Sequence, residues 1–383
     1  MKLKRLREDF VVHEVSDFPL SAGPFAVYRL DKSGIGTPEA IAEILQVWGL
    51  PRRSVGYGGM KDRHATTTQT ITLYKGPTRS LEQRGFHLQY VGQASREFHA
   101  KDILANRFEI TLRDLTTSQA DRIYTLLPSI ALGVPNYFDD QRFGSLGASG
   151  QFVAQPWCLG DYERALYLAI AEENDHDRPR EREQKEILRS EWGDWIQCKA
   201  RLDRSHRRSI VTYLVDHPTD FRRALALLRP DLRSIYMAAF QSHLWNEVAS
   251  RWLQRQLPPG SWIEKPSAAG SLTFWSDSSA TEIAMLADFE IPLPSARQHQ
   301  WPVGIESILN EVLTPFGMQK NEIRAKYPRD TFFSKGSRRL LLRPADLTSQ
   351  TDEDELTTGR RKIELAFTLP RGAYATMIVK CLT

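Results

Sequence analysis

The most informative part of the chain is the stretch Gly56-Tyr57-Gly58-Gly59-Met60-Lys61-Asp62-Arg63-His64-Ala65-Thr66-Thr67-Thr68-Gln69. It places one carboxylate, Asp62, between two cations on a glycine-rich segment. The residues that follow, 68–74, alternate and are rich in β-branched side chains, which is typical of a strand. We therefore expect a turn that is fastened to a strand and presents Asp62 in a fixed position.

Asp62 is a candidate nucleophile because its neighbours would keep it charged. Lys61 and Arg63 flank it in the sequence, and an opposite charge nearby holds the pKa of a carboxyl at or below its usual value of about 3.9. A carboxylate that stays ionised is a poor proton donor and suits nucleophilic attack or electrostatic stabilisation. On residue types alone, a solvated charged turn with no chemical role is the more common explanation of such a triplet.

The same stretch excludes two common phosphate-binding loops. A Walker loop needs Gly-Lys followed by Ser or Thr, whereas Lys61 follows Met60 and precedes Asp62. A dinucleotide fingerprint needs a third glycine and opens a helix, whereas this segment leads into a predicted strand. We expect no metal site, because the three cysteines are far apart and have no closely spaced histidines.

The clustering of Lys and Arg along the chain indicates contact with nucleic acid more clearly than the net charge does. The chain has 383 residues with 51 Lys plus Arg against 47 Asp plus Glu, a net charge of only +4. The cations cluster in residues 2–7 and 199–208, which is typical of phosphate-binding surfaces, although solvated faces have the same pattern. No apolar run approaches the roughly 18 residues of a membrane span, and the amino terminus lacks the apolar part of a secretory signal. These features predict a cytoplasmic protein.

Hydrophobic periodicity predicts an α+β fold. Strands are predicted at residues 9–15, 25–30, 90–92, 108–112 and 362–369. Thr37, as the cap, and Pro38 predict the start of a helix, and further helices are predicted at 118–132, through 157–255 and after 370. Strands in neighbouring runs favour a mainly antiparallel sheet. The charged segment 172–191 should be solvated and has no assigned role, and the Ser-rich tract 276–279 should be a loop.

A second cluster places aromatic side chains beside amides and an arginine: Pro135-Asn136-Tyr137-Phe138-Asp139-Asp140-Gln141-Arg142-Phe143-Gly144. Groups of these kinds stack on nucleobases and hydrogen-bond their edges. Aromatic runs are more often part of a hydrophobic core. Taken alone, the cluster leaves both explanations open.

Taken together, the two clusters resemble the TruD family of tRNA pseudouridine synthases. The family pattern is roughly Gly-x-Lys-Asp-(Lys/Arg)-x-Ala-x-Thr-x-Gln, and the chain matches it at Gly59, Lys61, Asp62, Arg63, Ala65, Thr67 and Gln69. Four further stretches resemble family motifs in the same order: Lys4 with residues 8–14, residues 136–138 with 141–144, residues 238–246, and residues 369–376. Five motifs in order make the resemblance specific, and it extends along nearly the whole chain.

The resemblance implies a two-part architecture. A pseudouridine synthase catalytic domain, with a mixed, mainly antiparallel sheet and flanking helices, is interrupted by an inserted α+β TRUD domain. We expect the catalytic domain to comprise residues 1–154 and 340–383, and the insertion to comprise residues 155–339.

The resemblance also implies the activity, which is the conversion of uridine to pseudouridine in tRNA, with position 13 as the family's target. Asp62 is the implied nucleophile, acting without cofactor or metal on a nucleotide that is flipped out of the RNA. Phe138 is expected to stack on the flipped base, and Lys4 to pair with Asp62 or with RNA. The other residues expected to contact RNA are Lys61, Arg63, Asn136 and Gln141.

Several alternatives stay open at this point. Asp62 could attack the sugar or the uracil ring, or promote glycosidic cleavage, and neither the RNA nor the target uridine is fixed by the sequence. The protein could also be a non-catalytic RNA-binding protein that kept the fold, or a pseudouridine synthase for another RNA site. The missing glycine-rich cofactor loop argues against a methyltransferase. The sequence leaves the oligomeric state open and is compatible with a monomer.

Overall fold

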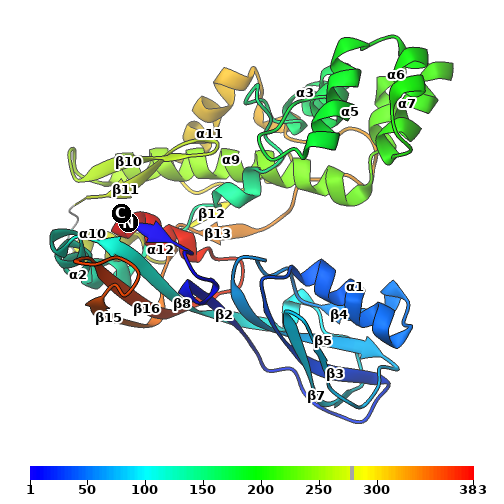
Figure 1. Ribbon diagram of the computed structural model, residues 1–383. Helices are drawn as coiled ribbons and strands as arrows, with labels where there is room; N and C mark the ends of the chain where they lie inside the picture. Colours follow the sequence, from blue (N-terminus) through cyan, green and yellow to red (C-terminus); the bar gives the residue numbers. More distant parts are fainter. Residues whose placement is uncertain (277–279) are drawn as a thin grey trace. The chain divides into compact units, whose positions relative to one another are not determined.

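The computed structural model describes residues 1–276 and 280–383 (Figure 1). These residues form two compact units, one comprising Met1–Val134 with Leu342–Thr383 and the other comprising Pro135–Leu341. The chain leaves the first unit within β9 (Val134–Pro135) and returns to it within β14 (Leu341–Leu342). An insertion therefore interrupts the first unit. The tract 276–279, predicted as a loop, lies outside the described residues apart from Ser276.

The first unit is built on one sheet, which contains ten strands among the described residues. Its order is β15-β16-β8-β2-β5-β3-β7-β6, with β1 paired to β8 and β4 to β5. Only the β2–β5 pair is parallel among the described pairings, so the predicted mixed, mainly antiparallel sheet is confirmed. The strands are β1 (Lys2–Leu3), β2 (Phe10–Ser16), β3 (Phe25–Ser33), β4 (Val55–Tyr57), β5 (Thr66–Tyr74), β6 (Leu81–Gln83), β7 (Phe86–Ala94), β8 (Ile103–Leu115), β15 (Ala345–Glu353) and β16 (Arg361–Pro370).

Helix α1 (Thr37–Trp48) covers one part of this sheet. Its apolar side chains Ile41 and Ile44 are buried against strand residues such as Tyr28 and Ile71, and each burial stabilises the fold by about 1.5–3 kcal/mol. The helix ends at Gly49, whose left-handed φ of 62° suits a residue without Cβ. Helices α2 (Thr117–Leu132) and α12 (Ala375–Leu382) pack against each other beside β16.

One detail of α1 differs from the sequence-based prediction. Pro38 lies in the first turn as expected, but the capping position is Gly36, and Thr37 is the first helical residue. The Thr37 hydroxyl is buried and takes part in other hydrogen bonds, which are described below with the loop that carries Asp62.

The second unit is organised around α9 (Pro230–Gln256), which runs through it from the β10–β11 hairpin to the helices α5–α7 (Figure 1). Its other helices are α3 (Ala154–Leu159), α4 (Tyr162–Ile170), α5 (Pro179–Ser190), α6 (Trp195–Arg201), α7 (His206–Asp216), α8 (Phe221–Ala226), α10 (Ala280–Leu286) and α11 (Ile305–Leu313). Its strands form two small antiparallel pairs, β10 (Trp262–Ser267) with β11 (Gly270–Trp275) and β12 (Glu290–Pro292) with β13 (Ser337–Arg339). Short 3-10 helices along the whole chain are η1 (Arg7–Asp9), η2 (Arg52–Ser54), η3 (Ala100–Asp102), η4 (Asp140–Phe143), η5 (Thr314–Phe316) and η6 (Lys320–Glu322). The predicted helical character of 157–255 is confirmed.

The first boundary between the units follows Val134, earlier than the boundary expected at 154/155. The second boundary follows Leu341, close to the boundary expected at 339/340. Residues 135–154 belong to the second unit because they are bonded to α9. The backbone N–H of Phe138 donates to Asn246 Oδ1 and the Asn246 amide donates to the Phe138 carbonyl, both at 2.9 Å. Further along, the rings of Phe152 and Phe240 pack with centroids 5.6 Å apart. The aromatic cluster of residues 135–144 is therefore part of the insertion.

No helix among the described residues is long and apolar enough to cross a membrane. No group of three or more His, Cys, Asp or Glu residues within that part of the chain has the geometry to hold a metal ion.

Candidate active site

Asp62 lies on the loop that joins β4 to β5, as the sequence predicts. The Lys4 ammonium donates a hydrogen bond to Asp62 Oδ2 and forms an ion pair with it. The backbone N–H of His64 donates to the other oxygen, Oδ1, at 3.0 Å. The Asp62 side chain remains 29% exposed. The carboxylate is thus oriented through both oxygens and is still open to solvent.

The electrostatic setting keeps Asp62 ionised. Partial burial alone would raise the pKa of its carboxyl, but the hydrogen bonds from Lys4 and from the His64 N–H, with the charge of Lys4, outweigh burial. The net effect lowers the pKa of Asp62 below its usual value. The predicted direction is therefore the one found, although the cation that bonds Asp62 is Lys4 and not Lys61 or Arg63.

The two flanking cations are directed to other carboxylates. Lys61 Nζ lies 3.2 Å from Glu14 Oε2, which is buried, and donates to Asn106 Oδ1 at 2.5 Å. Arg63 forms an ion pair with Glu39, a residue of α1. Because the chain turns at residues 63 and 64, adjacent side chains of this loop point in different directions, and adjacency in sequence did not identify the partner of Asp62.

The Asp62 loop is fixed by two buried polar side chains from neighbouring elements. Thr37 Oγ1 accepts the Lys61 backbone N–H at 2.9 Å and donates to Gln69 Oε1 at 2.8 Å. The Gln69 amide in turn donates to the Gly59 carbonyl at 3.3 Å. Because the loop is held at Gly59 and at Lys61, the residue before Asp62, the carboxylate is oriented before any substrate arrives.

Lys32 is a site residue that the sequence analysis missed. Its buried ammonium donates to the backbone carbonyl of Asp62 at 2.8 Å and to that of Ile35 at 2.9 Å. Burial lowers the pKa of Lys32 to about 8, although the charges of Asp62 and Glu39 oppose this effect. A signal was present in the sequence, because Lys32 has the same parity along β3 as the buried residues Tyr28 and Leu30. A cation on the inward face of a strand is costly to bury unless an anion or a hydrogen-bond acceptor pairs with it.

Lys4 itself has an unusual backbone. It lies between β1 and η1 with a φ of 57°, in the left-handed region that side chains other than glycine seldom adopt. Its ammonium also lies 4.2 Å from the centroid of the Phe10 ring. Strained backbone of this kind costs of order 1–3 kcal/mol and is concentrated at functional sites. The cost is consistent with a requirement to place the ammonium against Asp62.

The remaining predicted site residues belong to the second unit. Asn136 braces its own segment, since its amide donates to the Arg339 carbonyl at 3.0 Å and its Oδ1 accepts from Arg338 at 2.6 Å. Phe138 is only 7% exposed, with the Arg338 guanidinium 4.3 Å from its ring centroid and Trp245 edge-on at 5.6 Å. Gln141 is exposed in η4. Lys61, Asp62 and Arg63 thus lie on one loop of the first unit with Lys4 paired to Asp62, and Asn136 and Phe138 are packed within the second unit.

The chain was compared with protein families and solved structures. The family model described as "tRNA pseudouridine synthase D (TruD)" matches residues 1–382. "Probable tRNA pseudouridine synthase D 2" of Methanocaldococcus jannaschii is 30% identical over 99% of this chain and 91% of its own length. "Probable tRNA pseudouridine synthase D 1" of Methanococcus maripaludis is 28% identical over 99% and 98% respectively.

A solved structure agrees with these matches at the level of the fold. The putative TruD of Methanosarcina mazei superposes with a TM-score of 0.73, covers 99% of this chain and 92% of its own, and shares 22% of its sequence. The match over residues 1–382 and the near-complete coverage of the relatives confirm the resemblance found from the motifs. The chain belongs to the TruD family of tRNA pseudouridine synthases.

Proposed function

We propose that this protein isomerises uridine to pseudouridine in tRNA with Asp62 as its catalytic carboxylate. The observation that carries the proposal is the ion pair between Lys4 and Asp62 on a loop anchored from β3, β5 and α1. A carboxylate that is held in place and kept ionised is the group that nucleophilic catalysis requires. The curated relatives of similar length are named as tRNA pseudouridine synthases, which supports tRNA as the substrate.

The reaction balances without any added group. The bond between uracil N1 and the sugar C1′ breaks, the ring turns, and a bond between C5 and C1′ forms, while C5 loses a proton and N1 gains one. No oxidation or reduction takes place, so we propose that the enzyme uses no cofactor. Asp62 takes part as a carboxylate whether it attacks C1′, attacks the uracil ring or promotes loss of the base. All three routes need the ionised form that Lys4 favours.

We propose that the target uridine is flipped out of its stack, because the reacting carbon is otherwise hidden, at a cost of a few kcal/mol. Phe138 is proposed to stack on the flipped base. The Arg338 guanidinium lies against the Phe138 ring. For the base to stack on Phe138, that guanidinium must move away from the ring, or the base must stack on the planar guanidinium as well. Gln141, which is exposed, is proposed to bond the uracil edge, whereas the contacts of Asn136 support a bracing role.

The flanking cations have different proposed roles. Arg63 is half-exposed beside Glu39, and we propose that it contacts RNA phosphate. Lys61 is mostly buried against Glu14 and Asn106, and these contacts support a structural role with at most an indirect effect on RNA. The proposed target is position 13 of tRNA, the family's usual site, and the tRNA substrate is also our reason for proposing a cytoplasmic location.

The function is tested with purified protein and an unmodified tRNA transcript. The protein is dialysed against EDTA and given no additive, and pseudouridine is mapped by carbodiimide modification followed by primer extension. We expect conversion of a single uridine, at an undiminished rate after EDTA. A transcript that gains no pseudouridine at any position, while the protein binds it, would instead indicate an RNA-binding protein without catalysis. Mapping cellular tRNA with and without the protein then identifies the natural position.

A further inference from the structure

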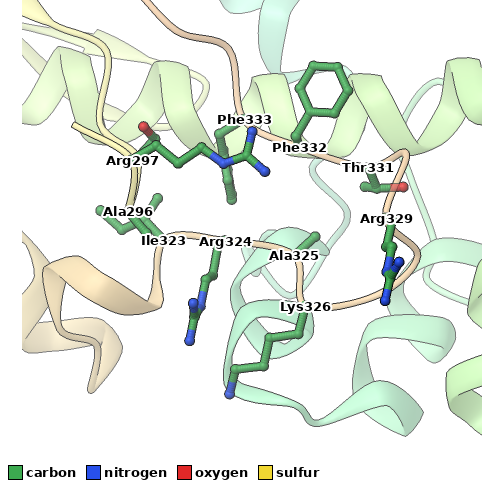
Figure 2. Close-up of a pocket in the computed structure, with 11 residues that line it drawn as sticks. Ala296, Arg297, Ile323, Arg324, Ala325, Lys326, Arg329, Thr331, Phe332 and Phe333 are labelled. Atoms are coloured by element: carbon green, nitrogen blue, oxygen red, sulfur yellow. The ribbon is translucent and has the colours of Figure 1, made fainter.

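The second unit contains a cavity of about 650 Å³ that the proposed reaction does not use (Figure 2). Two segments enclose it, one around residues 295–297 after β12 and the other spanning residues 323–333 after η6. Its volume is within the range of small-molecule sites and is large enough for a nucleotide. Both segments belong to one unit, so the cavity is defined independently of the Asp62 loop.

The lining of this cavity is strongly cationic. Its charged residues are Arg297, Arg324, Lys326 and Arg329, all exposed. Figure 2 shows Arg324, Lys326 and Arg329 extending in the same direction from their segment, with Arg297 on the facing one. Within the described part of the chain, no carboxylate lies within ion-pair distance of these four side chains or lines the cavity. Four uncompensated cations attract an anion of several charges.

The one acidic residue on the same segment is already neutralised elsewhere. Both oxygens of Asp330 accept hydrogen bonds at 2.8 Å from the guanidinium of Arg233, which is a buried residue of α9. The same guanidinium donates to Thr331 Oγ1 at 3.0 Å. Asp330 is thereby held by α9, and the positive charge of the cavity is left unopposed.

Buried polar side chains also hold the shape of the cavity. The Gln241 amide of α9 donates to the carbonyls of Pro294 and Ser334, at 3.0 and 2.9 Å, and so fixes one end of each segment. Trp157 donates to the Tyr327 carbonyl at 2.7 Å. The backbone N–H of Ala296 donates to the Ile323 carbonyl at 2.9 Å, which joins the two segments. A site whose walls are fixed in advance loses less entropy when it binds.

The 323–333 segment also carries an exposed aromatic ring, which Figure 2 shows extending to the opposite side from Arg324 and Lys326. Phe332 is 61% exposed, whereas its neighbour Phe333 is buried and forms part of the wall. A large apolar ring left in water next to positive charge is typical of surfaces that bind single-stranded nucleic acid, where a base stacks on the ring and cations contact the phosphates. An acidic peptide would use the cations but would gain little from the ring.

We infer that the two segments around this cavity bind a short unpaired stretch of the RNA, with its phosphates on Arg297, Arg324, Lys326 and Arg329 and one base on Phe332. The inference rests on the proposed function in that it takes RNA as the ligand. It adds a second contact for the substrate, in the unit that does not carry Asp62, and this contact would select RNA that has unpaired nucleotides.

The test measures binding of an unmodified tRNA transcript to protein carrying Asp62→Ala, so that no turnover occurs. The double variant Arg324→Ala/Arg329→Ala is compared with a matched control, Arg79→Ala/Arg84→Ala, which removes two exposed arginines at the hairpin of β6 and β7. We expect the cavity variant to bind about tenfold more weakly at moderate salt and to have a shallower salt dependence, by about 0.7 for each single-strand phosphate that is no longer neutralised. The control should stay within about twofold of the parent. Equal reductions of affinity in the two double variants would overturn the inference.

The ring and the class of ligand are tested separately. Phe332→Ala should weaken binding about fivefold or more without changing the salt dependence, because stacking releases no counterions. A single-stranded oligouridylate should compete with tRNA far better than poly-glutamate or inorganic phosphate does. The parent's affinity in Phe332→Ala, or equal competition by poly-glutamate, would contradict an RNA site.

Kinetics distinguish failure of this inference from failure of the proposed function. In protein with Asp62 intact, the Arg324→Ala/Arg329→Ala variant should raise KM for tRNA and leave kcat unchanged. If the parent converts uridine but the variant has the parent's KM, the cavity is not a substrate site and the proposed function stands. If the parent makes no pseudouridine, the proposed function fails, and the binding comparison still decides whether the cavity holds RNA.

Discussion

At the scale of single residues, the central feature is an ion pair between side chains 58 positions apart in the sequence. Lys4 and Asp62 are both partly exposed, and pairs of this kind contribute little to stability, about 0–1 kcal/mol. Lys4 nevertheless adopts a strained backbone to reach Asp62. Its contribution is therefore better explained by the chemistry of the carboxylate than by folding.

Removal of the Lys4 charge should change the pH dependence of the reaction. In Lys4→Met, burial of Asp62 is no longer opposed by a cation, so the pKa of Asp62 rises and the active carboxylate form is lost at a higher pH as pH falls. Because a hydrogen bond to a charged group contributes about 1.5–3 kcal/mol, kcat/KM should fall roughly tenfold to a hundredfold. Lys4→Arg keeps the charge and should keep the acid limb near that of the parent. An acid limb that does not move in Lys4→Met would show that Lys4 does not control Asp62.

The proposed stacking role of Phe138 makes a different prediction. Phe138→Ala should lower kcat about tenfold or more at saturating tRNA, since base–aromatic stacking contributes about 1–3 kcal/mol. Phe143 is also buried and lies in the same segment, so Phe143→Ala should cause a comparable loss of stability. Only Phe138→Ala should slow the folded enzyme. If both variants turn over at the parent's kcat, Phe138 is a core residue alone.

At the scale of elements, the loop between β4 and β5 shows what the sequence could and could not predict. The glycine-rich turn and the strand after it were predicted from local patterns, and both are found. Lys4 was expected from the family resemblance to pair with Asp62 or with RNA, and it pairs with Asp62. Thr37 and Lys32 were not predicted as partners of the loop, because they come from elements brought close only by the sheet and by α1. Thr37 was predicted to cap its helix from local pattern alone. Its hydroxyl instead serves a tertiary contact that no local pattern contains.

That tertiary contact can be tested by an isosteric change. Thr37→Val keeps the volume of the side chain but leaves the Lys61 N–H and the Gln69 carbonyl oxygen without their partner in a buried position. We expect a loss of about 1–3 kcal/mol in the free energy of unfolding, measured with denaturant, and a lower kcat because the loop loosens. Thr37→Ser retains the hydroxyl and should recover most of both. A stable and fully active Thr37→Val protein would refute the anchoring role.

Helix α9 gives the second unit a pH-dependent stability. His243 packs between Phe152 and Phe316, with ring centroids 4.8 and 5.7 Å away, and burial lowers its pKa to about 4. The unfolded chain takes up a proton near pH 6.5 and the folded one only near pH 4, so this contribution to stability is present above pH 6.5 and is lost as pH falls to about 4. We expect the denaturant midpoint to fall over that interval, by the equivalent of about 3 kcal/mol. His243→Gln should remove this component, whereas His206→Gln, at an exposed position, should leave it unchanged.

At the scale of the whole molecule, the order of motifs predicted the fold class and the interruption of one unit by an insertion. The boundary after residue 134 was not predicted, because the hydrogen bonds of Phe138 to Asn246 join segments 108 positions apart. The basic stretch 199–208 also differs from expectation. Arg201 and Arg207 form ion pairs with Glu191 and Glu181 of the charged segment 172–191. That segment therefore balances much of a surface that the sequence alone favoured for RNA.

Charge balance within the folded chain thus changes which cations are available for RNA. The basic stretch 199–208 is partly paired, whereas the four cations around the cavity of residues 295–297 and 323–333 make no ion pair within the described residues. Net charge of +4 gives no indication of this difference. Only the three-dimensional arrangement shows which positive charge remains uncompensated.

The central claim, that Asp62 is the catalytic carboxylate, is tested most directly by the single-turnover rate of pseudouridine formation in Asp62→Asn. The change removes one charge with almost no change in shape, and Asp346→Asn, at an exposed position in the same unit, makes the same chemical change elsewhere. We predict that Asp62→Asn binds tRNA like the parent but forms pseudouridine at least about a thousandfold more slowly, while Asp346→Asn keeps the parent's rate. Formation of pseudouridine by Asp62→Asn within about tenfold of the parent's rate would contradict the account.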